Sequence, residues 1–213
     1  MAINFMELKN PNATIPLRVA RGHFATSHSH INYYVDLTKT KYCLNEAREA
    51  ALLLTDSFKS TTIIDTILCL DGTEVVGACM ASELTRSRTF SMNSNREINV
   101  VTPEHTTGSQ LIFRDNIAGM IKGKKILVIG ASLTTGYTVM GAIEAVGYYG
   151  GSVVGVCALF SCLDEYAGFP VYSIFKTKKV LPDYESKVSS ECPLCKAGER
   201  LDAMVNTYGI SVI

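Results

Sequence analysis

The stretch ILVIGASLTTGYT, residues 126–138, constrains the fold of this chain more than any other part of its sequence. Four apolar residues run into a turn of small residues, and two threonines, a glycine, a tyrosine and a third threonine follow. The apolar run is typical of a buried strand, and the apolar residues of 137–148 have the spacing of a helix face. The stretch therefore predicts a strand, a turn and a helix.

An alternation of strands and helices extends over most of the chain. We expect strands at 31–37, 61–70, 96–102, 125–129, 152–160 and 171–175, helices at 46–59, 75–84 and 137–148, and a long loop or hairpin at 103–116. Asn45 is the expected N-cap of the first helix. Strands that alternate with helices form a parallel sheet, and ligands bind beyond the carboxyl ends of its strands. The predicted fold class is therefore α/β, with a parallel sheet flanked by helices.

Composition and charge exclude several classes of protein. Twenty basic residues balance twenty acidic ones in 213, which leaves no charge signature for nucleic acid or an anionic membrane. The N-terminus lacks a signal-peptide pattern. Glycines and Glu144 interrupt the apolar stretch 126–163, so a strand–helix–strand unit fits it better than a membrane span. Seven cysteines without an export signal indicate reduced thiols in the cytoplasm.

The turn before residues 137–148 has the chemistry of a phosphate site. A helix that starts at the end of a strand directs its free N–H groups and the positive end of its dipole at one point. Threonine hydroxyls add donors there, and a glycine lets the backbone approach a ligand closely. The expected phosphate-binding residues are Ser132, Thr134, Thr135, Gly136, Tyr137 and Thr138. The alternative is that these residues only cap the helix.

The same turn resembles the motif with which type I phosphoribosyltransferases bind 5-phosphoribosyl 1-pyrophosphate (PRPP). Two further segments resemble orotate phosphoribosyltransferases of that family. RGHFATSHSHINYY, residues 21–34, is similar to their N-terminal segment, and residues 169–201, with the sequence CPLC, are similar to the tail of a bacterial and archaeal subgroup. The resemblance implies one domain over 1–213, with a small N-terminal hood at about 1–42 and a C-terminal tail at about 176–213.

The resemblance also implies ligands and site residues. PRPP or a nucleoside monophosphate would be the ligand, Mg²⁺ would accompany PRPP, and the chain would be a homodimer that acts in pyrimidine biosynthesis. The loop Asp71, Gly72, Thr73 and Glu74 would bind pyrophosphate, and Thr26, His30, Tyr33 and Tyr34 would form the base pocket. The rings of Tyr33 and Tyr34 are expected to sandwich a flat heterocycle.

The chain departs from the family pattern at positions that carry charge. The two acids that grip the ribose hydroxyls in the family fall on Gly130 and Ala131. The loop that supplies a cation to pyrophosphate corresponds to 103–116, which offers Glu104 and His105 and no lysine. Thr26 stands at the position where the family has a basic residue in the base site. The family's Asp-Arg, whose arginine helps to read the carboxylate of orotate, is replaced by Ser-Cys at 161–162.

Three functions remain open from these residues, one of them a structural subunit for an active paralogue, and no catalytic residue is assigned. The chain is a phosphoribosyltransferase with key residues replaced, or it is a non-catalytic phosphoribosyl or nucleotide binder on the same fold. Lost cations remove the stabilisation of departing pyrophosphate, which favours the binder. Asp71 and Glu74 either compensate for the missing acids or cap the helix at 75–84. Without such compensation, Mg²⁺ is expected to add little to PRPP binding.

Cys192 and Cys195 have the spacing of metal ligands. Zinc takes four ligands, and one Cys-x-x-Cys pair supplies two. A second pair from a symmetric dimer, Cys43 or a histidine would have to complete the site. The alternative is a surface loop with two free thiols.

Overall fold

The computed structural model describes residues 3–10, 13–86, 91–106 and 110–213 of the chain, which form two large sheets. The central sheet has the order β10-β11-β9-β8-β4-β5. Its strands are β4 (Thr66–Cys69), β5 (Asn99–Val101), β8 (Lys125–Leu133), β9 (Ser152–Ser161), β10 (Glu165–Tyr166) and β11 (Phe169–Lys176). All neighbours are parallel except β10 and β11. The prediction of a parallel α/β sheet is confirmed.

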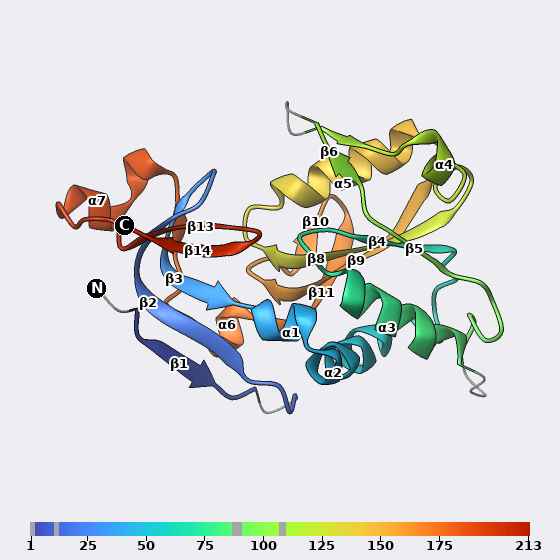
Figure 1. The fold of residues 1–213 in the computed structure, drawn as a ribbon, viewed down its shortest axis with the longest axis horizontal. Helices are drawn as coiled ribbons and strands as arrows, with labels where there is room; N and C mark the ends of the chain where they lie inside the picture. The colour runs from blue at the N-terminus through green and yellow to red at the C-terminus, as the bar shows by residue number, and fades with distance from the viewer. Residues whose placement is uncertain (1–2, 11–12, 87–90, 107–109) are drawn as a thin grey trace.

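Helices cover both faces of the central sheet (Figure 1). Helices α2 (Leu44–Thr55) and α3 (Glu74–Thr85) pack on one face, where Ile67 belongs to their hydrophobic cluster. Helix α5 (Tyr137–Tyr148) packs on the other face, and Leu68 belongs to that cluster. Successive strand residues point to opposite faces. Because both faces are covered, every residue of β4 is buried, which explains its continuous apolar sequence.

The second sheet joins the two ends of the chain. It contains β1 (Phe5–Leu8), β2 (Leu17–Ala25), β3 (His30–Asp36), β12 (Ser186–Lys187), β13 (Ala203–Asn206) and β14 (Gly209–Val212). Strand β13 lies parallel to β2, with Ala203 opposite Phe24. We call it the N-terminal sheet. Figure 1 shows the β13–β14 hairpin reaching from this sheet toward the end of β8.

Several expected boundaries were wrong. Helix α2 starts at Leu44 with Cys43 as N-cap, not Asn45, and ends at Thr55. The strand expected at 61–70 occupies only Thr66–Cys69. Strand β2 was not expected at all. The tail, expected to contain no strand beyond 171–175, contains β12, β13 and β14.

Short elements complete the chain. These are α1 (Thr38–Tyr42), α4 (Asp115–Ala118), α6 (Thr177–Val180), η1 (Ser189–Glu191) and α7 (Pro193–Lys196). The expected hairpin within 103–116 exists as β6 (Glu104–His105) paired with β7 (Leu111–Ile112), and residues 107–109 lie outside the described part. No helix among the described residues is long and apolar enough to cross a membrane.

Candidate functional site

A cavity of about 250 Å³ lies where the N-terminal sheet meets the carboxyl end of β8. Most of its lining comes from three segments, which are the turn between β2 and β3 with the residues that follow, the loop between β8 and α5, and the tip of the β13–β14 hairpin; Asp71 and Tyr184 also line it. The N-terminal and C-terminal parts of the chain therefore cover the end of the parallel sheet, which is the place where α/β proteins bind ligands.

The structure brings all six expected phosphate-binding residues to this cavity: Ser132, Thr134, Thr135, Gly136, Tyr137 and Thr138. Gly136 is the N-cap of α5, so the first free N–H groups of the helix follow it. Within the described part of the chain, the hydroxyls of Ser132, Thr134, Thr135 and Thr138 have no hydrogen-bond partner. The loop therefore offers unused donors and a helix N-terminus to one volume.

Gly136 is required at its position for two reasons. Its φ of +84° lies in the left-handed region, which side chains rarely adopt. A Cβ atom at this position would also lie 2.3 Å from Cε2 of Tyr166. The ring of Tyr166 therefore packs directly against the backbone of the loop.

Of the four residues in the expected pyrophosphate loop, Asp71 alone lines the cavity. Asp71 lines the cavity with a φ of +57°, and its burial raises the pKa of the carboxyl, an effect that Lys41 and His105 oppose. Gly72, Thr73 and Glu74 are not among the cavity-lining residues. The Thr73 hydroxyl donates to the carbonyl of Leu70, and Glu74 accepts from the Thr102 hydroxyl. Thr73 is the N-cap of α3 and no side-chain bond caps that helix, so neither acid has that role.

Lys41 is a cavity residue that sequence reasoning missed. Its Nζ donates to the carbonyl oxygens of Asp71 and Thr207, both at 3.0 Å. Burial lowers the pKa of this amine, against the raising effect of nearby carboxylates. Among the described residues that line the cavity, Lys41 is the only lysine or arginine and Asp71 the only acid. No sequence signal marks Lys41, because a short helix outside the motifs carries it.

The structure separates the four residues expected to form the base pocket. Thr26 and Tyr34 line the cavity, whereas His30 and Tyr33 do not. The hydroxyl of Tyr33 donates to Asp183, which raises the pKa of the phenol. Because Tyr33 and Tyr34 are consecutive in β3, their side chains leave opposite faces of the sheet. The expected sandwich of a heterocycle between their rings is therefore wrong.

The charged residues of the 103–116 segment are already paired. Arg114, a basic residue that the sequence analysis passed over, donates two hydrogen bonds of 2.6 Å to the Glu104 carboxylate. Both side chains are exposed, and the pair lowers the pKa of Glu104 and raises that of Arg114. The guanidinium is thus held by its own hairpin.

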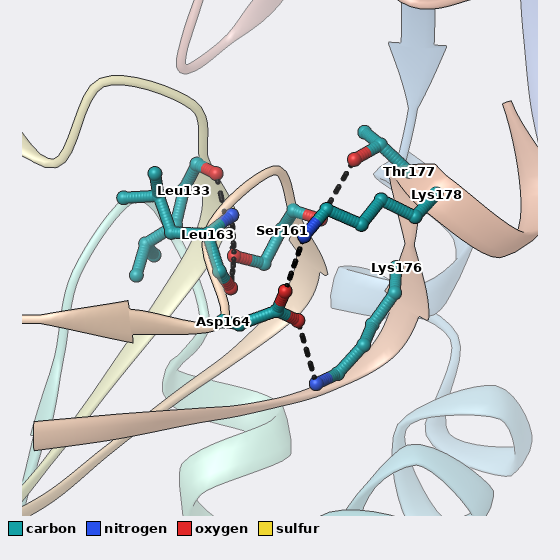
Figure 2. A network of polar contacts seen from close by, with 7 residues as sticks. All are labelled: Leu133, Ser161, Leu163, Asp164, Lys176, Thr177 and Lys178. Atoms are coloured by element: carbon teal, nitrogen blue, oxygen red, sulfur yellow. Dashed lines mark hydrogen bonds and ion pairs between the residues drawn. The ribbon is translucent and has the colours of Figure 1, made fainter. Parts of the chain in front are cut away.

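The Ser-Cys pair at 161–162 lies beside the phosphate loop, at the end of β9. Figure 2 shows the Ser161 hydroxyl between the carbonyls of Leu133 and Leu163, to which it donates at 3.5 and 2.9 Å. In the same network, hydrogen bonds from Lys178 and Lys176 lower the pKa of Asp164 to about 2. The two lysines therefore hold the 164 carboxylate, and neither is among the cavity-lining residues.

The two positions of the missing acid pair, Gly130 and Ala131, differ in their surroundings. A Cβ atom on Gly130 would lie 2.8 Å from Cδ1 of Leu133 and 3.9 Å from Oδ2 of Asp71. Ala131 is buried and lines the cavity. The Asp71 carboxylate thus comes close to Gly130, one of the two positions where the motif lacks its acids.

A second cluster lies outside the cavity. Ligand atoms of His23, His30, Cys192 and Cys195 all lie within 4.8 Å of one another. His30 thus belongs to this cluster and does not line the cavity. The expected pair Cys192 and Cys195 is joined by two histidines of the same chain, and Cys43 is not part of the cluster.

No protein-family model matches the chain. A curated relative, the orotate phosphoribosyltransferase of Caldanaerobacter subterraneus subsp. tengcongensis, is 29% identical over 184 residues, which cover 84% of this chain and 86% of the relative. The chain is therefore similar to an orotate phosphoribosyltransferase over most of its length.

Similarity to solved structures shows that the chain has the type I phosphoribosyltransferase fold. The orotate phosphoribosyltransferase of Aeropyrum pernix is similar with a TM-score of 0.52 and 21% identity, over 77% of this chain and 90% of that one. The Mycobacterium tuberculosis H37Rv enzyme in complex with PRPP is similar with a TM-score of 0.51 and 18% identity, over 68% of this chain and 81% of that one.

Proposed function

We propose that this chain binds the 5′-phosphate of a ribosyl ligand, PRPP or a nucleoside monophosphate, in the cavity at the start of α5. The observation that carries the proposal is the set of hydroxyls on the 132–138 loop that have no partner among the described residues. They surround a helix N-terminus that favours anions. Similarity to orotate phosphoribosyltransferases supports a ribosyl phosphate over other phosphate esters.

In this proposal the remaining cavity residues hold the sugar and the pyrophosphate. Lys41 would face the pyrophosphate, because it is the only lysine or arginine among the described lining residues. Asp71 would accept hydrogen bonds from the ribose hydroxyls in place of the acids that are absent at Gly130 and Ala131. Mg²⁺, when bound with PRPP, would neutralise part of the pyrophosphate charge, and Asp71 is the oxygen donor that fits it.

We further propose that transfer of the phosphoribosyl group to orotate is weak, so that binding is the principal activity. Two observations favour a binding protein over an active transferase. Arg114 is paired with Glu104, and the Ser161 hydroxyl is bonded to the carbonyl of Leu163. The other candidate is an active transferase in pyrimidine biosynthesis that uses Lys41 and Asp71 in compensation. In either case we propose a cytoplasmic protein, since all seven cysteines are free thiols. We also propose a homodimer, as the resemblance to the family implies.

Replacing Thr135 by valine should sharply reduce the stabilisation by ribose 5-phosphate. The Thr135 side chain is exposed in the cavity and its hydroxyl has no partner among the described residues. Loss of a hydrogen bond to a charged group costs about 1.5–3 kcal/mol, or at least ~10-fold in affinity. Thermal denaturation with and without ribose 5-phosphate measures this, because a ligand of the folded state raises Tm.

Thr61→Val is the matched control for that experiment, since Thr61 is exposed and lies outside the cavity lining. It should keep the full response to ribose 5-phosphate. An undiminished response in Thr135→Val would put the phosphate elsewhere and reject the assignment.

Mg²⁺ should strengthen PRPP binding through Asp71 and not through Glu74. Asp71 lines the cavity, whereas Glu74 is bonded to Thr102 outside its lining. Calorimetry should therefore show a Mg²⁺ effect in the wild type and in Glu74→Gln, and little or none in Asp71→Asn. If Asp71→Asn retains the wild-type effect of Mg²⁺ on PRPP binding, the 71–74 loop does not replace the missing acids.

A further inference from the structure

We propose that His23, His30, Cys192 and Cys195 form a structural zinc site that fastens the C-terminal tail to the N-terminal sheet. The site goes beyond the proposed function, because it lies outside the ribosyl-phosphate cavity and needs no ligand there. His23 comes from β2, His30 from β3, Cys192 is the N-cap of α7 and Cys195 lies within that helix. The cluster therefore joins two ends of the chain.

Four of the six distances within the cluster are close to the edges of a tetrahedron around one metal ion. His23 Nε2 lies 3.1 Å from His30 Nδ1, 3.5 Å from Cys192 Sγ and 3.6 Å from Cys195 Sγ. His30 Nδ1 lies 3.1 Å from Cys195 Sγ. Zinc bonds of ~2.3 Å to sulfur and ~2.0–2.1 Å to nitrogen give edges of roughly 3.3 Å between two nitrogens and 3.6 Å between nitrogen and sulfur. The four atoms are thus spaced as ligands of one ion.

The surroundings of His23 prepare it for a metal. Its other ring nitrogen, Nδ1, lies 3.1 Å from the carbonyl oxygen of Glu199. An N–H on Nδ1 donates to this carbonyl and leaves a lone pair on Nε2, directed at the cluster, which is the usual arrangement for a histidine that binds zinc. His23 is only 2% exposed, so the nitrogen is shielded from water.

The 187–200 segment needs an anchor of this kind because it has almost no core of its own. In the fully described range 187–200, Cys192 is the only buried residue. Helix α7 has four residues and no side-chain cap. Metal binding is the usual source of order in segments that bury too little apolar surface. Two thiolates and two imidazoles suit zinc, whereas Mg²⁺ prefers oxygen ligands.

The metal content of the purified protein tests this assignment without any ribosyl ligand. Protein prepared under reducing conditions with supplied Zn²⁺ should retain one zinc per chain by mass spectrometry of the metal. Cys195→Ser should weaken Zn²⁺ binding by more than the ~10–100-fold that loss of an outer-shell partner costs. The control is Cys43→Ser, which removes a partly buried thiol outside the cluster and should keep one zinc per chain.

Chelation of the wild type covers the case in which the variant does not fold. Removing zinc should lower Tm and expose the 187–200 segment to protease, and returning Zn²⁺ should reverse both effects. Reduced, folded protein that retains no zinc when it is supplied would overturn the proposal, as would a Cys192–Cys195 disulfide in protein isolated from cells. Failure to bind ribose 5-phosphate would leave the zinc result unchanged, so the two proposals fail separately.

Discussion

An assay with orotate, PRPP and Mg²⁺ should give a turnover at least ~10³-fold below that of an active orotate phosphoribosyltransferase. Loss of one group that stabilises developing charge typically costs ~10²–10³ in rate. Here the arginine of the 103–116 segment, Arg114, is held by Glu104, and the acids of the family pattern are missing at 130–131. The combined loss should bring turnover well below the ordinary range of about 1–1000 per second.

The structure gives the physical reason for this expectation. Departing pyrophosphate would meet Lys41, whose Nζ already donates to the carbonyls of Asp71 and Thr207. Arg114 is held by two hydrogen bonds to Glu104. A cation that is already neutralised or saturated adds little new stabilisation in the transition state.

The Caldanaerobacter relative is a suitable positive control for the assay. A rise of Tm with ribose 5-phosphate shows that the tested protein is folded and binds a ribosyl phosphate. A second arm uses Glu104→Gln, which frees Arg114 from its ion pair and should raise the residual rate. An ordinary turnover in the unmodified chain would show that Lys41 and Asp71 compensate fully, and would establish the active transferase instead.

Replacing Gly136 by alanine should both destabilise the fold and remove the response to ribose 5-phosphate. The left-handed backbone costs a residue with Cβ about 1–2 kcal/mol, and displacing the Tyr166 ring adds about 1–3 kcal/mol. The free energy of unfolding should therefore fall by roughly 2–5 kcal/mol in denaturant titration. Because Gly136 is the N-cap of α5, the shift also moves the N–H groups that face the proposed phosphate.

Gly141→Ala is the matched control in the same helix. A Cβ there meets Cδ1 of Leu111 at an ordinary 3.9 Å, and the backbone is helical. Alanine should stabilise the helix by about 0.5–1 kcal/mol and leave binding intact. Adding Tyr166→Ala to Gly136→Ala should restore only the part of the lost unfolding free energy that comes from the clash with the Tyr166 ring. Equal stabilities of Gly136→Ala and wild type would refute the account of this turn.

Local patterns in the sequence were sufficient for the elements closest to the site. Helix α5 occupies Tyr137–Tyr148 as expected, and all six expected phosphate residues line one cavity. Helical spacing and strand runs depend on neighbouring residues, and the turn between β8 and α5 is set by its own glycine. These features are therefore readable without knowing what packs against them.

Contacts between distant segments were decided only by the tertiary structure. Strand β13 pairs with β2 from the opposite end of the chain, and no local signal specifies that partner. Tyr33 and Tyr34 look like a pair in sequence but leave opposite faces of their strand. Lys41 enters the cavity only because α1 packs beside the 71–74 loop, where its amine meets the carbonyl of Asp71.

The metal cluster combines both kinds of information. The spacing of Cys192 and Cys195 identified two ligands, because residues three apart in a short helical turn lie close together by local geometry. His23 and His30 join them across 162 or more positions, since residue 192 minus residue 30 is 162. Sequence determined which short segments have the chemistry for phosphate and metal. Folding determined which of those segments meet, because the burial of apolar surface by two sheets positions side chains that no sequence period relates.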